Sequence, residues 1–311
     1  MEVINILLSA TIFLVMISIG SSIKLKELHN IFKKPKKLIL GLILQIILFP
    51  LFAFIIANIS NLSPEYKIGL IILAACPGGT LSNFISYLVK ADTPLSVGLT
   101  TTNSIVILAT IPIYISLAFK IFLGQTTSIV PPIGNILGTV LLLVIAPVLL
   151  GSYFRYLKPR KTTKAQNTLK FVSSILIGLL FLIKFIGSEN VGGIGLSKEL
   201  ILTILPWALL LNIIGLFLGW GISYLFKIKN KAATTMGIEV GLQNTVLALV
   251  VTDIILLEPI LGHPALIYSL FSFWTTLLFG IFMLENNNKI FKRFKKHREL
   301  HSLRWKKKSE K

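Results

Sequence analysis

Apolar residues fill the chain in blocks of roughly 20, and short charged or polar stretches separate these blocks. A helix of that length crosses a hydrocarbon core about 30 Å thick, whereas the strands of an outer-membrane barrel alternate over about 10 residues. The pattern therefore predicts an all-α polytopic membrane protein. Hydropathy and the interrupting charges place about nine transmembrane helices near 4–23, 38–58, 66–89, 93–119, 131–154, 168–188, 199–226, 231–256 and 262–285.

The composition supports this prediction, because only 14% of the residues are charged, against about 25% in soluble domains. The first span lacks a basic leader and a small-residue cleavage motif, so we expect a retained helix rather than a signal peptide. We expect a transmembrane domain over 1–285 and a basic cytoplasmic tail over 286–311.

The net charge of +19 could indicate a nucleic-acid partner, but the placement of the basic residues favours a membrane. Lys and Arg gather on alternate loops, at 24–37, 90, 155–170, 227–231 and 286–311. This positive-inside pattern predicts a cell-membrane protein with its N-terminus outside and its C-terminus cytoplasmic. We interpret the tail as an anchor to a bilayer with an anionic inner leaflet and expect no nucleic-acid partner.

Polar residues interrupt the third span at a point where a helix is hard to continue. The stretch Ala75-Cys76-Pro77-Gly78-Gly79-Thr80-Leu81-Ser82-Asn83 combines a proline and two glycines with three polar side chains. A helix break in the bilayer frees backbone groups, which is tolerated only where they face protein, water or an ion. A simple proline kink is the alternative, and Thr80, Ser82 and Asn83 favour the functional interpretation.

The eighth span contains the second polar segment, Gly237-Ile238-Glu239-Val240-Gly241-Leu242-Gln243-Asn244. A carboxylate at this depth is energetically unfavourable, and Glu239 is the one acidic residue that we place well inside a span. The basic residues lie near span ends and offer no evident partner. We therefore predict that Glu239 is functional.

The two interrupted spans lie five spans apart, so they run in opposite directions through the membrane. This arrangement is typical of inverted repeats, whose broken helices cross at mid-membrane; we place the repeats at about 1–120 and 131–285. Gln45 and the pair Ser96 and Thr100, which share a helix face, fit the same cavity. Structural roles for the pair, through bonds to their own backbone, remain an alternative.

Two long motifs, CPGGTLSNFISYLVKADTPLSVGLTTT and IEVGLQNTVLAL, resemble the bile acid:sodium symporter family, and the similarity covers nearly the whole chain. The resemblance implies a ten-helix fold, here nine without a leading helix, divided into a panel domain and a core domain with crossing broken helices. It also implies two Na⁺ sites. The first would use Ser82, Asn83, Ser96, Thr100 and Glu239, and the second Gln45, Glu239, Gln243 and the carbonyls of Val240 and Leu242.

The last span departs from the family pattern. Many relatives carry a His-Asn pair there, whereas this chain reads Ser269-Leu270-Phe271-Ser272-Phe273-Trp274. The implied substrate is a small organic anion, bile-acid-like or another carboxylate, and we assign Thr80, Asn244 and Ser272 to its site. The sequence does not predict the oligomeric state.

Sodium-coupled symport is the function that these features favour. A proton-coupled or efflux transporter on the same fold is the main alternative. An enzyme using Glu239 would lack a nucleophile or metal partner, since the four histidines have no ligand spacing. A non-transport membrane adaptor would have no need for helix breaks beside a buried carboxylate.

Overall fold

The computed structural model describes residues 35–124, 146–186 and 197–284, with single positions between 10 and 21 and at 138 and 142. All regular elements in these ranges are helices. Four of them are long and apolar enough to cross a membrane: Pro35–Ile59, Lys198–Leu225, Asn230–Ile255 and Pro259–Leu284; a bent helix over 93–122 would make a fifth. The predicted all-α membrane class is confirmed. The number nine stays a prediction, because the spans at 4–23 and 131–154 fall partly, and the tail at 286–311 wholly, outside the described residues.

The first long helix consists of α3 (Pro35–Leu42), a π-helical turn η1 (Ile43–Leu48) and α4 (Phe49–Ile59). Its exposed apolar side chains recur every four residues, at Ile39, Ile43, Ile47, Leu51, Ile55 and Ile59. Such a stripe is the face that a membrane helix presents to lipid, whereas Gln45 is buried on another face.

The predicted break in the third span is observed between α5 (Pro64–Ala75) and α6 (Thr80–Leu88). Helix α7 (Thr93–Phe122) follows, with Asp92 as its N-cap and Pro112 inside it. This helix bends by 61° between Ile107 and Ala109. The bend lies four residues before Pro112, where the proline ring clashes with a carbonyl and removes its hydrogen bond.

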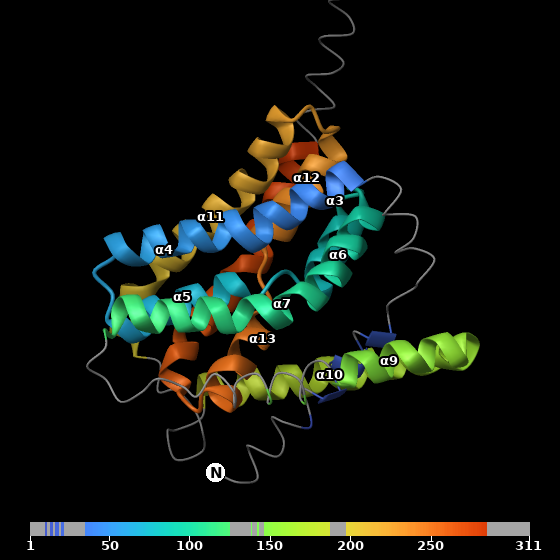
Figure 1. Cartoon of the computed structure of the whole chain (residues 1–311), viewed down its shortest axis with the longest axis horizontal. Helices are drawn as coiled ribbons and strands as arrows, with labels where there is room; N and C mark the ends of the chain where they lie inside the picture. Colours follow the sequence, from blue (N-terminus) through green and yellow to red (C-terminus); the bar gives the residue numbers. More distant parts are fainter. Residues whose placement is uncertain are drawn as a thin grey trace, which may run out of the picture.

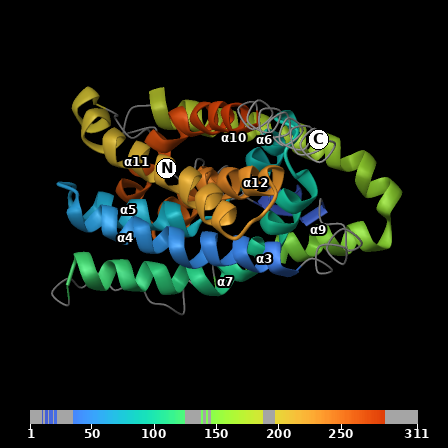
Figure 2. The same ribbon diagram turned by 90° about the horizontal axis from the view of Figure 1, so that it is seen from above.

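The C-terminal part repeats the order of long helix, broken span and long helix. It comprises α11 (Lys198–Leu225), α12 (Asn230–Gly241), α13 (Thr245–Val250), η4 (Val251–Ile255), η5 (Pro259–Gly262) and the helix that continues to Leu284. The second predicted break is therefore also observed, between α12 and α13. Helix α11 packs on α12 so closely that the two backbones are in contact (Figure 2). A Cβ at Gly219 would lie 2.4 Å from Met236 O.

Helices α9 (Ala146–Leu157) and α10 (Pro159–Ile186) pack together and lie apart from α3, α4 and α11 (Figure 1). The Arg155 guanidinium donates to Gln166 Oε1 at 3.2 Å across this pair. A Cβ at Gly151 of α9 would lie 2.3 Å from Ile17 O, so the N-terminal segment contacts α9 closely.

The two broken spans run in opposite directions, as the sequence predicts. Residue Asp92, which follows α6, donates its N–H to Thr235 near the start of α12 at 2.9 Å. At the other end of the molecule, the Tyr66 ring at the start of α5 contacts the His263 ring beyond α13, 5.5 Å away. The end of one broken span thus lies beside the start of the other.

Candidate functional site

The breaks of the two spans touch each other at the centre of the bundle. The Asn244 N–H donates to Cys76 O at 3.1 Å and so joins the breaks directly. A Cβ at Gly78 would lie 2.9 Å from Leu242 O, 3.0 Å from Ser82 Oγ and 3.1 Å from Glu239 O. Only a residue without a side chain fits at this crossing, which explains the glycine at position 78.

Four predicted site residues gather around the carboxylate of the fifth, Glu239. Ser96 donates to Glu239 Oε1, and Thr100 Oγ1 donates to Oε2 at 3.0 Å. Asn83 Oδ1 lies 2.8 Å from Ser96 Oγ and 3.3 Å from Thr100 Oγ1. The Ser82 hydroxyl also faces the carboxylate and donates to Gly79 O at 2.8 Å. We call these residues, Ser82, Asn83, Ser96, Thr100 and Glu239, the first oxygen cluster.

The first oxygen cluster holds more acceptors than hydrogens. Ser96 and Thr100 each carry one hydroxyl hydrogen, yet each lies within hydrogen-bonding distance of both Asn83 Oδ1 and the Glu239 carboxylate. Glu239 is fully buried, and none of the described Lys or Arg side chains forms an ion pair with it. A buried carboxylate without a cation is unfavourable, so the cluster has the chemistry of a cation site.

A second group of oxygens comes from the carbonyl end of α12. A helix that stops at Gly241 leaves its last carbonyls without intrahelical donors. Side-chain amides supply these donors instead: Gln45 Nε2 bonds Glu239 O at 2.9 Å, and Gln243 Nε2 bonds Val240 O at 2.6 Å. We call Gln45, Gln243, Asn103 and the carbonyls of Glu239, Val240 and Leu242 the second oxygen cluster.

Asn103 belongs to this cluster although the sequence analysis did not single it out. Its amide group donates to Gln45 Oε1, and the Gln45 bond to Glu239 O fixes the orientation of both amides. Asn103 Oδ1 and Gln243 Oε1 are then buried and have no hydrogen-bond donor in the part of the chain that the structure describes. Ser96, Thr100 and Asn103 are spaced i, i+4 and i+7 on α7, a helical pattern that could have revealed the residue.

Asn212, Tyr268 and Thr275 form a polar network at the end of α12 that was not predicted as part of the site. The Asn212 amide donates to Gly241 O at 2.7 Å, and the Tyr268 hydroxyl donates to the same oxygen. Thr275 Oγ1 donates to Asn212 Oδ1 at 2.7 Å. The network shows that Asn212 and Tyr268 cap the C-terminal end of α12.

The three predicted substrate residues lie on three different elements. Asn244 lies at the break and caps α13 by accepting the Leu247 N–H at 3.0 Å. Ser272 is buried in the last helix, where its carbonyl accepts from Thr275 at 3.1 Å. Thr80 begins α6, but its side chain lies outside the described residues.

A second buried carboxylate lies near the end of the eighth span. Asp253 lies in the π-helical turn η4 and is buried, with its Oδ1 accepting from Thr252 Oγ1 at 3.1 Å. Asp253 lies two residues before this span ends at Ile255, whereas Glu239 lies well inside it. Among the described residues no three His, Cys, Asp or Glu side chains are grouped as a transition-metal site would need.

Comparison with known proteins shows similarity to one family and to several of its members. The model of the sodium bile acid symporter family matches residues 10–194, more than half of the chain. The chain is 30% identical over 237 residues to the sodium-dependent transporter YocS of Bacillus subtilis, covering 76% of this chain and 70% of YocS. It is 29% identical over 273 residues to the human ileal sodium/bile acid cotransporter, covering 86% and 76% of the two chains.

A plant relative is similar over a smaller share of its length. The chain is 29% identical over 259 residues to the probable chloroplastic sodium/metabolite cotransporter BASS1 of Arabidopsis thaliana, covering 82% of this chain but only 61% of BASS1. With the two broken spans and the oxygen clusters at their crossing, these similarities lead to one conclusion: the chain belongs to the sodium bile acid symporter family, a family of transporters and not of enzymes.

Proposed function

We propose that this protein is a secondary active transporter that couples Na⁺ to the symport of a small organic anion. Family membership supports sodium coupling. The observation that carries the proposal for this chain is the buried Glu239 carboxylate, which lies among oxygen atoms and has no basic partner in the described residues.

The first oxygen cluster would bind one Na⁺. A hard cation prefers oxygen ligands, and each of the five side chains offers one. The carboxylate would provide the neutralising charge, while Asn83 and the hydroxyls of Ser82, Ser96 and Thr100 would complete the coordination. A cation among these oxygens would also relieve the shortage of hydrogens between them.

The second oxygen cluster would bind a second Na⁺. Its ligands would come from Gln45, Gln243 and the carbonyls at the end of α12, with Asn103 added to the residues that the sequence predicts. The two amide oxygens without donors, Asn103 Oδ1 and Gln243 Oε1, support this assignment. The Gln45 side chain bonds the main-chain oxygen of Glu239. The Glu239 carboxylate contacts Ser96 and Thr100 and so belongs to the first cluster.

An anionic substrate follows from charge balance. Two sodium ions facing one buried carboxylate leave about one positive charge, and a substrate carboxylate near the crossing would offset it. Helix α6 begins at the same crossing, and the N-terminal end of a helix favours anions. We place the substrate beside Thr80, Asn244 and Ser272.

Transport would proceed by alternating access between two parts of the molecule. The core domain would contain both broken spans and their long partner helices, and the panel domain would contain α9, α10 and the predicted span near 4–23. The common order of long helix, broken span and long helix supports inverted repeats at about 1–120 and 131–285. We place the protein in the cell membrane, with the N-terminus outside and the C-terminus cytoplasmic.

Thermal stability of the purified protein tests the proposal. A ligand that binds the folded state raises its unfolding temperature with concentration. We expect NaCl to stabilise the protein more than choline chloride at equal ionic strength, and a carboxylate library to contain compounds that stabilise it further when sodium is present. Equal responses to both salts would contradict sodium coupling and favour the proton-coupled or efflux alternative.

A further inference from the structure

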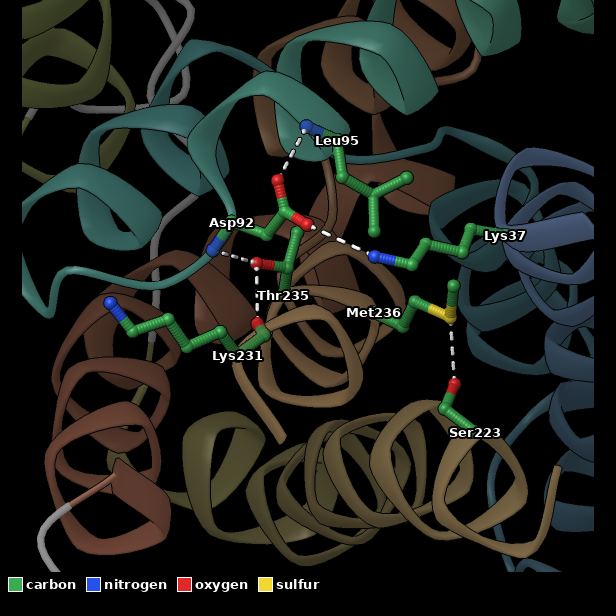
Figure 3. A network of polar contacts seen from close by, with 7 residues as sticks. All are labelled: Lys37, Asp92, Leu95, Ser223, Lys231, Thr235 and Met236. Atoms are coloured by element: carbon green, nitrogen blue, oxygen red, sulfur yellow. Dashed lines mark hydrogen bonds and ion pairs between the residues drawn. The ribbon is translucent and has the colours of Figure 1, made fainter. Parts of the chain in front are cut away.

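A separate group of polar residues lies one helical turn from the first oxygen cluster, at the end of the molecule where α3, α7 and α12 begin (Figure 3). Asp92 is at its centre and caps α7, because its Oδ1 accepts the Leu95 N–H at 3.3 Å. Its Oδ2 lies 3.4 Å from the Lys37 ammonium on α3. Its main-chain N–H donates to Thr235 Oγ1 on α12 at 2.9 Å. One residue thus connects three helices.

Two of these three helices, α7 and α12, carry ligands of the first oxygen cluster. Ser96 follows Asp92 by four residues on α7, and Glu239 follows Thr235 by four residues on α12. Four residues rise about 6 Å along a helix, slightly more than one turn. The Asp92–Thr235 contact is therefore repeated as the Ser96–Glu239 contact, and the first contact fixes the register in which the second one forms.

Thr235 holds this register from a buried position. Its side chain is fully buried, and its hydroxyl accepts the Asp92 N–H while donating to Lys231 O at 3.0 Å. On a neighbouring face of α12, Ser223 of α11 donates to Met236 Sδ at 2.7 Å (Figure 3). The Asp92–Thr235 bond therefore joins, at this end of the molecule, α7, which carries Ser96 and Thr100, to α12, which carries Glu239.

We propose that Asp92, Thr235 and Lys37 form a clamp that positions α7 against α12 and thereby sets the sodium affinity of the first oxygen cluster. The inference rests on the proposed sodium-coupled function. These residues lie one turn or more from the cluster, so they are positioning residues and not ligands.

The members of the clamp differ in their expected contribution. Lys37 and Asp92 each have side chains 29% exposed, and solvent weakens such ion pairs. The Thr235 hydroxyl is buried, and its removal leaves the Asp92 N–H without its partner. We expect Thr235→Val to raise the sodium concentration for half-maximal stabilisation by about threefold to tenfold, the fold-change that corresponds to the net contribution of one hydrogen bond. Lys37→Met should change it by less than about twofold.

The neighbouring Thr234 provides a matched control on the same helix. It is equally buried, but its hydroxyl has no hydrogen-bond partner in the described part of the chain. Thr234→Val makes the same chemical change without opening the clamp, so its sodium response should stay at the wild-type value. Thr235→Ser restores a hydroxyl and should recover most of the affinity. If the valine variant does not fold, Thr235→Ala makes the same test.

The experiment is a sodium titration of thermal stability on purified full-length variants, completed by a double-mutant cycle with Ser96→Ala. If the clamp acts through the Ser96–Glu239 contact, Thr235→Val should cost less affinity in the Ser96→Ala background than in the wild type. A normal sodium response of Thr235→Val, an equal loss in Thr234→Val, or strictly additive effects would each overturn the clamp. Absence of any sodium effect on the wild type would instead contradict the proposed function.

Discussion

Asn83 and Gln45 each belong to a different oxygen cluster and therefore separate the two proposed sodium sites. Asn83 Oδ1 contacts the hydroxyls of Ser96 and Thr100, whereas Gln45 bonds the carbonyl of Glu239. Asn83→Ala should weaken the first site chiefly and Gln45→Ala the second, each by about 1 to 3 kcal/mol, the range for a lost buried polar contact. Calorimetric sodium titrations should show one weakened binding step in each variant. Identical effects in both would contradict two separate sites.

Asn103 makes a stricter test because only the structure identified it. Asn103→Leu keeps a similar volume but removes the oxygen that we assign to the second site and the donor that orients Gln45. The same titration should show a loss at the second site comparable to that of Gln45→Ala, with the first site unchanged. A normal second step in this variant would exclude Asn103 as a ligand.

Two glycines with different surroundings, Gly78 at the crossing and Gly221 on α11, give a prediction about the broken helices. A Cβ at Gly78 would press on Leu242 O and Glu239 O, whereas a Cβ at Gly221 of α11 would meet nothing within 4 Å. Gly78→Ala should destabilise the protein by about 1 to 3 kcal/mol and abolish the sodium response. Gly221→Ala should leave the response intact and raise stability by up to about 1 kcal/mol. Thermal unfolding with and without sodium distinguishes these outcomes, and equal behaviour of the two variants would contradict the crossing geometry.

Local chemistry made both helix breaks predictable. Glycine beside polar side chains weakens a helix in lipid, Pro77 adds to this effect at the first break, and both breaks occur at such residues. The Ser96 and Thr100 pair was predictable for the same reason, since i and i+4 share a face in any helix.

Other features depended on contacts that the sequence does not show. The π-helical turn that contains Gln45 and the bonds between its side chain, Asn103 and Glu239 join residues far apart in the chain. Asp253 lies near the end of the eighth span, and the turn η4 buries it. Packing between elements, and not local propensity, decides these details.

Topology is the prediction for the molecule as a whole. The structure groups the ends of its helices in two sets, with Lys37, Asp92 and Asn230 at one end and Tyr66 and His263 at the other. The basic residues at 37, 90 and 227–231 belong to the first set, which the positive-inside rule assigns to the cytoplasm. We expect reporter fusions within 155–170 and at the tail to be cytoplasmic as well. A fusion in 155–170 found outside would contradict the orientation.

The basic tail gives a second prediction at this scale. Both motif regions end before residue 286, so deletion of 288–311 should leave sodium-coupled transport intact and affect only insertion or abundance. Transport per inserted molecule, measured against the full-length chain, checks this. Loss of turnover in correctly inserted protein would show that the tail takes part in transport.

Uptake into proteoliposomes tests sodium coupling most directly. The substrate would be the carboxylate that stabilises the purified protein most, and wild-type protein is compared with Glu239→Gln under an inward sodium gradient and with choline in its place. We predict accumulation by the wild type only with sodium, and loss in Glu239→Gln, because removing a buried charge from a cation site costs about 2 to 5 kcal/mol. Accumulation that does not depend on the sodium gradient, or normal sodium-driven uptake by Glu239→Gln, would contradict sodium coupling through Glu239.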